Sequence, residues 1–492
     1  MKNFVWILIA MAALPVRAAV YELKASAAEQ SVTVQLTLPE STATEFRMPA
    51  WSPGDYRIVN FGGRLKNVRF SLDGKYVDGA KMSADANVWF VTTGADTVTY
   101  TVPAGDPGIF SENLRVTEQE VFVHGPAVFG YFVGHALEAH ELGVALHPDP
   151  RATIECSLDQ TSEGPGRIVL TAPDYDTLID APFAMGSNLK VKEFLAHGKP
   201  HRVVAFGRAG NVDLDGLADV GAKIASQCYA LFGEIPTKRY IYLYDFGGPG
   251  GGLEHADSAR MAMWPGLTPR NASSYIAHEY FHLYNVKRIR AKPLGPFDYT
   301  KPAITGSLWW LEGVTDYYAE VLTHRAGLQS RDTLLDTLSD EMRSFRRDPA
   351  RLKTSADESS RRVWEADNSA GFGIGYYQKG KLIGWCLDLA VRAESLNKRS
   401  LDDVMTTLYN ECKGGKPGFS EGRIRELAVQ FGSEAVGPIY DRCVLQAVEL
   451  PIEELLAKVG LQWKDGKVTV NAQASETARA IGLNWPMLVK RN

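Results

Sequence analysis

The 492-residue sequence has few of the features that mark several protein classes. It contains no internal repeat, low-complexity tract or basic run, and its composition excludes collagen-like, disordered and coiled-coil chains. The formal net charge of −5 argues against nucleic acid as the main partner. There are five cysteines without Cys-x-x-Cys spacing, and we interpret them as small buried apolar residues. A disulfide remains possible, and Cys412–Cys443 is the first pair to test.

One apolar run stands at the start of the chain. Lys2 precedes the run Phe4–Val16, which is too short to span a bilayer comfortably. Ala18 then supplies a small residue before a cleavage point. This pattern predicts a signal peptide over residues 1–18, with an uncleaved anchor as the alternative. We therefore expect an exported protein, periplasmic or secreted, without stable membrane insertion after cleavage.

The length predicts about three domains. Residues 19–190 alternate apolar and polar positions between turns, as in Val32, Val34 and Leu36, which predicts a β-sandwich-like domain. Helical spacing from Leu217 to Leu231 and an aromatic strand near 239–246 begin a second region, 191–325. Helices are expected over 326–460, including one capped at Ser400. Residues 461–492 form a short tail with a hairpin around Asp465-Gly466.

The most specific motif is His278-Glu279-Tyr280-Phe281-His282, an H-E-x-x-H sequence. On a helix, residues four apart share one face, so both imidazoles can reach one zinc ion. Glu279 is rotated by about 100° from His278, which keeps it off the metal but beside an attacking water. The motif therefore predicts a zinc site with Glu279 as general base.

A catalytic zinc needs a third protein ligand. Asn285 and Arg288 stand where a metzincin has Gly and His, so that class is excluded. We favour Glu312, which follows an apolar aromatic run 30 positions after His282, over the rival Glu320. Asp316 lies one helical turn after Glu312 and can accept a hydrogen bond from the outer nitrogen of a ligand histidine.

The sequence resembles the glycyl aminopeptidase family of gluzincin metallopeptidases. The resemblance covers most of the mature chain to about residue 460. It rests on five stretches in the family's order: Trp51–Arg57, Gly252-Leu253-Glu254-His255, His278–Arg290, Trp310–Tyr318 and Tyr376–Leu382.

The resemblance implies roles for further residues. Gly252-Leu253-Glu254-His255 would be an exopeptidase motif on an edge strand, with Glu254 binding the free α-ammonium of a substrate. A flexible surface loop is the alternative for the glycine-rich run, and His255 either shapes the amine site or satisfies a strand end. The Tyr377 hydroxyl would hydrogen-bond the oxyanion, with the adjacent Tyr376 as the alternative.

Together these features predict a multidomain α+β protein. It would have an N-terminal β-sandwich-like domain, a thermolysin-like catalytic domain and a helical C-terminal domain. The expected activity is that of a zinc aminopeptidase with one Zn²⁺ ion, acting on peptides. The resemblance implies preference for Gly or Ala at the N-terminus, and a C-terminal PDZ domain that is truncated or missing here. Alternatives are an endopeptidase or oligopeptidase on the same fold, or a non-catalytic peptide-binding relative.

The remaining charged and histidine residues are expected to be structural. We interpret Lys287, Arg288 and Arg290 as a solvated face after the zinc helix. The histidines outside the motif are expected at the surface or satisfied in the core: His124, His135, His140, His147, His197, His201 and His324.

Overall fold

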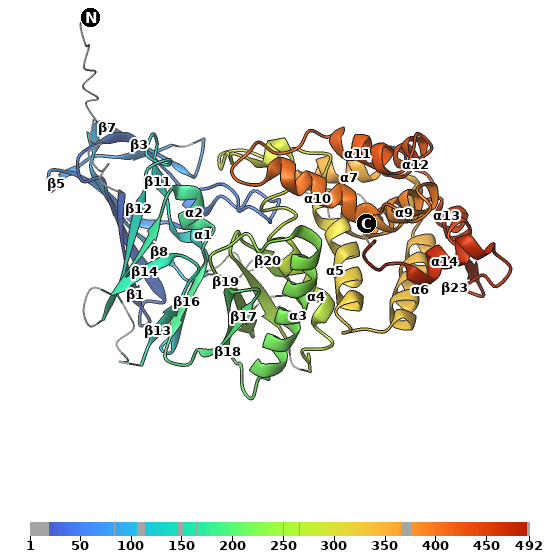
Figure 1. Cartoon of the computed structure of the whole chain (residues 1–492). Coiled ribbons are helices and arrows are strands. Elements are labelled where there is room, and N and C mark those ends of the chain that lie inside the picture. The colour runs from blue at the N-terminus through green and yellow to red at the C-terminus, as the bar shows by residue number, and fades with distance from the viewer. Residues whose placement is uncertain are drawn as a thin grey trace, which may run out of the picture.

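The computed structural model describes residues 19–489, except 83, 106–113, 146–148, 150, 163–165, 249, 265 and 366–374. The predicted signal peptide lies outside the described residues. Three parts follow one another along the molecule: β-sheets in blue and cyan, a smaller sheet with helices in green, and helices from yellow to red (Figure 1). This order confirms the predicted α+β architecture.

The first part is built from three sheets around one apolar core. One has eight strands in the order β14 (Asp159–Ser162), β15 (Arg167–Ala172), β12 (His140–Ala145), β1 (Ala19–Ser26), β2 (Ser31–Thr37), β8 (Thr97–Pro103), β4 (Lys66–Leu72) and β5 (Lys75–Val77). A four-stranded sheet has the order β13 (Thr153–Glu155), β16 (Phe183–Gly186), β10 (Glu120–Val123) and β9 (Leu114–Val116). Another has the order β11 (Tyr131–Phe132), β3 (Ala43–Arg47), β7 (Val88–Ala95) and β6 (Ala80–Lys81).

Period-2 alternation selects the buried face of these strands. In β2, Val32, Val34 and Leu36 are buried, while Thr33 and Gln35 between them are exposed. Short helical turns connect the strands: η1 (Phe61–Arg64), α1 (Gly125–Val128) and α2 (Tyr175–Ile179).

The central part carries a five-stranded sheet in the order β17 (Lys190–Ala196), β18 (Lys199–Gly207), β19 (Tyr240–Phe246), β21 (Ser258–Met263) and β20 (Gly252–Glu254). Strands β18, β19 and β21 are parallel, while β20 pairs antiparallel to β21 at the edge of the sheet. Helix α3 (Leu214–Phe232) packs on β17 and β18, and α4 (Ser273–Phe281) packs on β20, β21 and α3. The edge strand and the helix with the zinc motif are therefore neighbours.

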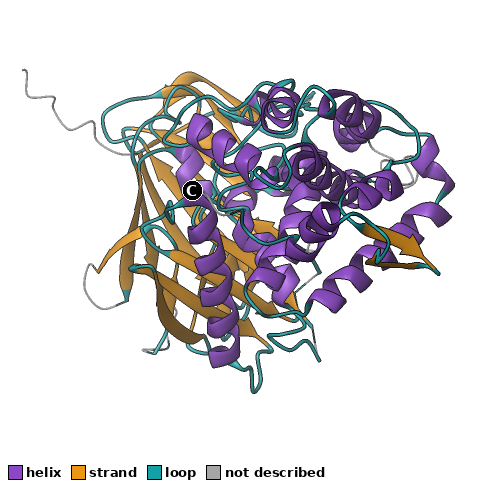
Figure 2. Ribbon diagram, turned by 45° about the vertical axis from the view of Figure 1, so that its right-hand side comes forward, coloured by secondary structure: helices purple, strands orange, loops and turns teal. Residues whose placement is uncertain are grey.

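The third part is helical, as Figure 2 shows in purple. The π-helical turn η3 (Trp309–Gly313) leads into α5, and α9 runs through the centre of the helical core. The helices are α5 (Val314–Arg325), α6 (Arg331–Arg347), α7 (Ala356–Arg361), α9 (Tyr376–Glu394), α10 (Leu401–Cys412), α11 (Arg423–Phe431), α12 (Val436–Val444), α13 (Ile452–Lys458) and α14 (Glu476–Asn484). Short 3-10 turns are η2 (Lys292–Leu294), η4 (Pro349–Leu352) and η5 (Arg362–Trp364).

Several local signals act as predicted in this region. Ser400 is the N-cap of α10, and its backbone N–H donates to Asp403 Oδ2 at 3.0 Å, as in a capping box. The hairpin of β22 (Leu461–Lys464) and β23 (Lys467–Val470) turns at Asp465-Gly466. It packs on α13 and α6, so the residues after 460 share the helical core.

The cysteines are buried free thiols. The suggested Cys412–Cys443 disulfide is therefore wrong. Cys443 instead lies beside Cys386. The interpretation of the cysteines as small apolar core residues is confirmed, since Cys228 and Cys443, for example, are each 0% exposed.

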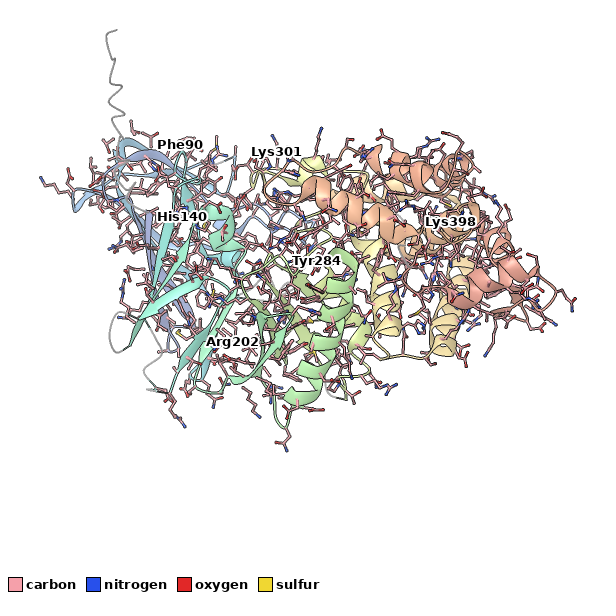
Figure 3. All side chains as sticks on the ribbon, in the orientation of Figure 1. Phe90, His140, Arg202, Tyr284, Lys301 and Lys398 are labelled. Carbon is pink, nitrogen blue, oxygen red and sulfur yellow. The ribbon has the colours of Figure 1, made fainter. Side chains whose placement is uncertain are left out.

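Ion pairs join the first part to the central sheet. The Arg202 guanidinium of β18 donates to Glu155 Oε2 of β13 at 2.6 Å, and Figure 3 labels Arg202 at this junction. Arg115 of β9 donates to Asp245 of β19 at 2.9 Å. No helix in the described part of the chain is long and apolar enough to cross a membrane.

Candidate active site

The two motif histidines lie at the C-terminal end of α4. The helix ends at Phe281, and His282 is its C-cap, so both imidazoles project from the last turn. Their Nε2 atoms are 2.9 Å apart. Tyr280, Phe281 and Ile276 are completely buried on the other sides of the helix, which fixes the direction of both rings.

Glu312 completes the cluster from the π-helical turn η3. Its Oε2 lies 3.3 Å from His282 Nε2 and 3.7 Å from His278 Nε2. Single π-turns often occur at functional sites, because the wider turn redirects a side chain. The rival Glu320 points elsewhere: it accepts hydrogen bonds from Ser274 and Lys381 at 3.0 and 3.2 Å.

The outer nitrogens of both histidines are held by acceptors. His278 Nδ1 lies 2.8 Å from Asp316 Oδ1, and His282 Nδ1 lies 2.6 Å from the backbone oxygen of Asn285. These contacts direct both Nε2 atoms toward Glu312 in the form that binds a cation. Asp316 therefore contacts the outer nitrogen of His278, which is the hydrogen bond that its position one turn after Glu312 predicts.

The donor set of His278, His282 and Glu312 fits zinc. Two imidazole nitrogens and one carboxylate oxygen lie within 4.8 Å of one another, and they face a cleft that leaves a fourth position open. Glu312 Oε1 is buried and makes no hydrogen bond to any described residue. A bound cation would compensate for this missing hydrogen bond. Burial opposes ionisation of Glu312, but the two histidines hold its pKa well below the ordinary range. The ligand carboxylate is therefore charged.

Glu279 lies beside the cluster without belonging to it. It is 4% exposed, and its Oε2 has no hydrogen-bond partner among the described residues. Burial raises the pKa of Glu279 to about 7, against the opposing effect of His278 and His282. A carboxylate with such a pKa is suited to accept and return a proton near neutral pH.

Glu254 reaches the same cleft from the edge strand β20. It is 5% exposed, and Oε1 has no hydrogen-bond partner in the described structure. The loop at Gly54 presses against this carboxylate, since a Cβ at Gly54 would stand 2.9 Å from Oε1. Gly54 also has φ +92°, a backbone conformation that other residues rarely adopt. Position 54 therefore requires glycine both for this conformation and for the lack of room for a Cβ.

Three tyrosines lie close to the metal cluster, and one of them, Tyr377, lines the cleft. Tyr377, in the first turn of α9, lines the cleft with its ring stacked 6.2 Å from the His278 ring. Burial, followed by the negative charge of Glu312, raises the pKa of Tyr377 well above its ordinary value, so the hydroxyl remains a proton donor. Tyr376 packs on Tyr377 at 4.8 Å but does not line the cleft. Burial, Glu312 and Glu254 likewise raise the pKa of Tyr56, which the sequence had given no role.

Two family models match the sequence: the M61 glycyl aminopeptidase model over residues 271–383 and the peptidase M61 N-terminal domain over residues 20–187. Together they cover more than half of the chain. The chain belongs to the M61 glycyl aminopeptidase family. It is therefore an enzyme, a peptidase, and the matched ranges contain His278, Glu279, His282, Glu312 and Tyr377.

Solved structures share the architecture. An aminopeptidase N family protein from Idiomarina loihiensis is 26% identical, with a TM-score of 0.83, over 90% of this chain and 78% of that chain. An M1 zinc metallopeptidase from Deinococcus radiodurans is 13% identical, with a TM-score of 0.56, over 89% and 95%. Yeast LTA4 hydrolase is 13% identical, with a TM-score of 0.55, over 88% and 68%. The last two likenesses concern the fold. No curated protein matches the sequence significantly.

The basic residues after the zinc helix are not a solvated face, and that expectation is wrong. Lys287 Nζ lies 3.0 Å from Asp180 Oδ1, and the Lys287 side chain is 7% exposed. Arg288 donates to Asp257 Oδ1 and to the backbone oxygen of Pro236. Both residues are partly buried: Asp180 of the first part of the chain holds Lys287, whereas the partners of Arg288 belong to the central part.

His255 belongs to the same junction rather than to the cleft. Its Nδ1 lies 3.0 Å from Asp180 Oδ1, and its ring lies 6.0 Å from that of His124. Gly252, by contrast, lines the cleft with Glu254. Of the proposed substrate-binding residues, the structure thus brings Gly252 and Glu254 to the metal cluster and places His255 behind them.

The cleft has a volume of about 320 Å³ and contains the metal cluster, Glu279, Glu254 and Tyr377. A second cavity of about 230 Å³ lies beyond Glu254, between Trp51, Lys287 and Phe297. Gly54 and Glu254 line both cavities, so they stand where the two meet. The loop Trp51–Arg57 therefore reaches the cleft through Gly54, while Trp51, Pro53 and Tyr56 line the second cavity.

Proposed function

We propose that the protein is a zinc aminopeptidase that binds one Zn²⁺ ion through His278, His282 and Glu312. It releases one residue from a free N-terminus, chiefly Gly or Ala. The observation that carries this proposal is the buried carboxylate of Glu254, with an unpartnered oxygen in the same cleft as the metal cluster. A buried carboxylate with an unpartnered oxygen favours the binding of a positively charged group, such as the free α-ammonium of a substrate.

The residues of the cleft divide the chemistry between them. Bound zinc would polarise the scissile carbonyl and acidify the attacking water. Glu279 takes the proton of that water and passes it to the leaving amine. Tyr377 donates its hydroxyl proton in a hydrogen bond to the developing oxyanion. Glu254 holds the substrate's N-terminus, so that the first peptide bond lies at the metal cluster.

The preference for small residues rests on the family resemblance. Gly54 lies against the Glu254 carboxylate where the cleft meets the second cavity, and this narrow point favours a small N-terminal side chain. The initial rates on Gly-, Ala-, Leu- and Phe-p-nitroanilide test it directly. Higher kcat/KM for Leu or Phe than for Gly and Ala would contradict the preference and leave the aminopeptidase activity intact.

The test of the activity itself compares free and N-acetylated substrates. We expect hydrolysis of Ala-p-nitroanilide and of Ala-Ala-Ala, loss of activity with a chelator, and recovery with added zinc. Glu279→Gln should abolish turnover. Equal cleavage of N-acetyl-Ala-Ala-Ala would favour an endopeptidase or oligopeptidase, with the peptide continuing past Glu254 into the second cavity.

The proposal extends to the location of the protein. The apolar segment before Ala19 supports export, periplasmic or secreted, with cleavage after Ala18. N-terminal sequencing of the protein purified from its source tests this. A chain beginning at residue 1 in the cytosolic fraction would overturn it.

A further inference from the structure

A large cavity lies outside the catalytic cleft, at the end of the central sheet. It has a volume of about 620 Å³, almost twice that of the cleft. It is bounded by residues at or just after the carboxyl ends of the parallel strands β18, β19 and β21, among them Arg208, Phe246 and Met263. The carboxyl ends of parallel strands are a common place for ligands.

The edge strand β20 sets the direction in which a bound peptide would run. A peptide that adds antiparallel to β20 with its N-terminus at Glu254 continues past Gly252. Because β20 is itself antiparallel to β21, that peptide runs in the same direction as β21. Strand β21 ends at Met263, so the peptide advances toward the cavity.

Aromatic rings connect the cleft to this cavity. Tyr275 lines the cleft, one helical turn before His278 and Glu279. Trp264 lines the cavity, and its ring lies 6.1 Å from that of Tyr275. Trp264 is 51% exposed, among the more exposed large apolar residues of the described chain. An exposed tryptophan beside a catalytic cleft is suited to contact a ligand.

The strand register gives the reach. Gly252 pairs with Met261, two residues before Met263 and three before Trp264. At about 3.3 Å per residue, a substrate residue three to five positions after the N-terminal residue arrives level with the cavity. A dipeptide or a p-nitroanilide ends before it.

The lining indicates which side chain the cavity accepts. Its walls are mostly apolar and include Val212, Leu217, Phe246, Met263 and Leu267. The carboxylate of Asp213 at its rim already accepts a hydrogen bond from the Gly216 backbone at 2.8 Å. The apolar walls therefore favour a large apolar or aromatic side chain.

We propose that this cavity is a downstream subsite of the peptidase. It takes a large apolar side chain three to five residues after the N-terminus of the substrate. The inference rests on the proposed aminopeptidase function, because Glu254 supplies the fixed end from which the peptide direction is counted. The subsite makes the enzyme prefer longer peptides over dipeptides.

The test compares Ala-Gly-Gly-Gly-Phe-Gly with Ala-Gly-Gly-Gly-Ser-Gly, and shifts Phe by one position in either direction. We expect kcat/KM to be about tenfold higher for the best Phe peptide than for its Ser counterpart, mainly through KM. Trp264→Ala should remove this advantage and leave Ala-p-nitroanilide hydrolysis unchanged. Trp264→Phe should retain most of it. Tyr76→Ala, at a 69% exposed aromatic residue on β5, is the matched control and should change nothing.

The outcomes separate the two proposals. Equal kcat/KM for Phe and Ser peptides at every position, with Ala-p-nitroanilide cleaved, overturns the subsite alone. If no substrate is cleaved, the aminopeptidase proposal fails, and calorimetric binding of the same peptides decides the subsite. Tighter binding of the Phe peptide that Trp264→Ala abolishes supports the subsite, and equal binding overturns it.

Discussion

The α-carbon of Gly252 lies directly against the carboxylate of Glu279. A Cβ at position 252 would stand 1.9 Å from Glu279 Oε1, well inside contact distance. Gly252 belongs to the edge strand and Glu279 to the zinc helix, so this contact sets the position of the proposed base relative to the strand. Position 252 requires glycine for its lack of a side chain and not for its backbone conformation, since its φ does not lie in the left-handed region.

Gly252→Ala is therefore expected to displace the Glu279 carboxylate by an ångström or more. We expect kcat to fall about 100-fold, since misplacement of this size disturbs proton transfer. Zinc content, measured by plasma mass spectrometry, should remain at the wild-type level. Gly250→Ala is the matched control, because a Cβ there meets nothing within 4 Å. Equal activity of both variants would refute the spacing argument.

Asp316→Asn should weaken zinc binding about 10- to 100-fold, because His278 loses its charged acceptor. Competition with a chromophoric chelator measures this affinity. Circular dichroism should show an unchanged fold. Wild-type affinity in the variant would show that Asp316 does not position His278.

Separate substitutions of Glu312 and Glu320 test which of these two carboxylates binds zinc. Glu312→Gln should lose zinc, since it removes the anionic donor of the cluster. Glu320→Gln should keep zinc and instead lower stability by about 1–3 kcal/mol, because it weakens a buried contact with Lys381. Zinc loss in the Glu320 variant at an unchanged unfolding midpoint would reverse the assignment.

Local sequence carries much of the fold and the metal cluster. The spacing of His278 and His282, the apolar run before Glu312 and the Asp465-Gly466 turn each act within a few residues, so pattern alone predicts them. Alternation along β2 predicts its buried face for the same reason.

The parts that sequence could not supply depend on segments far apart in the chain. Periodicity says that a face is buried but not what covers it. Gly54 meets Glu254 across 200 positions, and Asp180 meets Lys287 across 107, so neither contact has a local signal. Lys287 follows a helix and carries a charge, which made a solvated position the natural expectation.

Tyr377→Phe should lower kcat about 100- to 1,000-fold with little change in KM, because the hydroxyl acts on charge that develops in the transition state. Tyr376→Phe is the matched control: its ring packs on Tyr377 but does not line the cleft. Steady-state kinetics on Ala-p-nitroanilide separate the two. A larger loss of kcat in Tyr376→Phe than in Tyr377→Phe would show that Tyr376 is the tyrosine that stabilises the oxyanion.

Buried histidines should make the protein sensitive to acid. Burial lowers the pKa of His201 to about 4, and the neutral ring bridges the Lys199 backbone oxygen and the Tyr280 hydroxyl. Burial also lowers the pKa of His124 to about 3 and that of His140 to about 4. The unfolded chain binds these protons near pH 6.5, so stability is full above that pH and falls progressively toward pH 4.

His201 alone should contribute a loss of about 3 kcal/mol across this window. His201→Gln removes the titrating ring, so its urea unfolding midpoint should fall less steeply between pH 6.5 and 4.5 than that of the wild type. His197→Asn, at an exposed histidine on the neighbouring turn with φ 47°, is the control and should keep the wild-type slope. Parallel pH profiles for the wild type and His201→Gln would show that the histidine has the same pKa in the folded and unfolded protein, against the lowering expected from its burial.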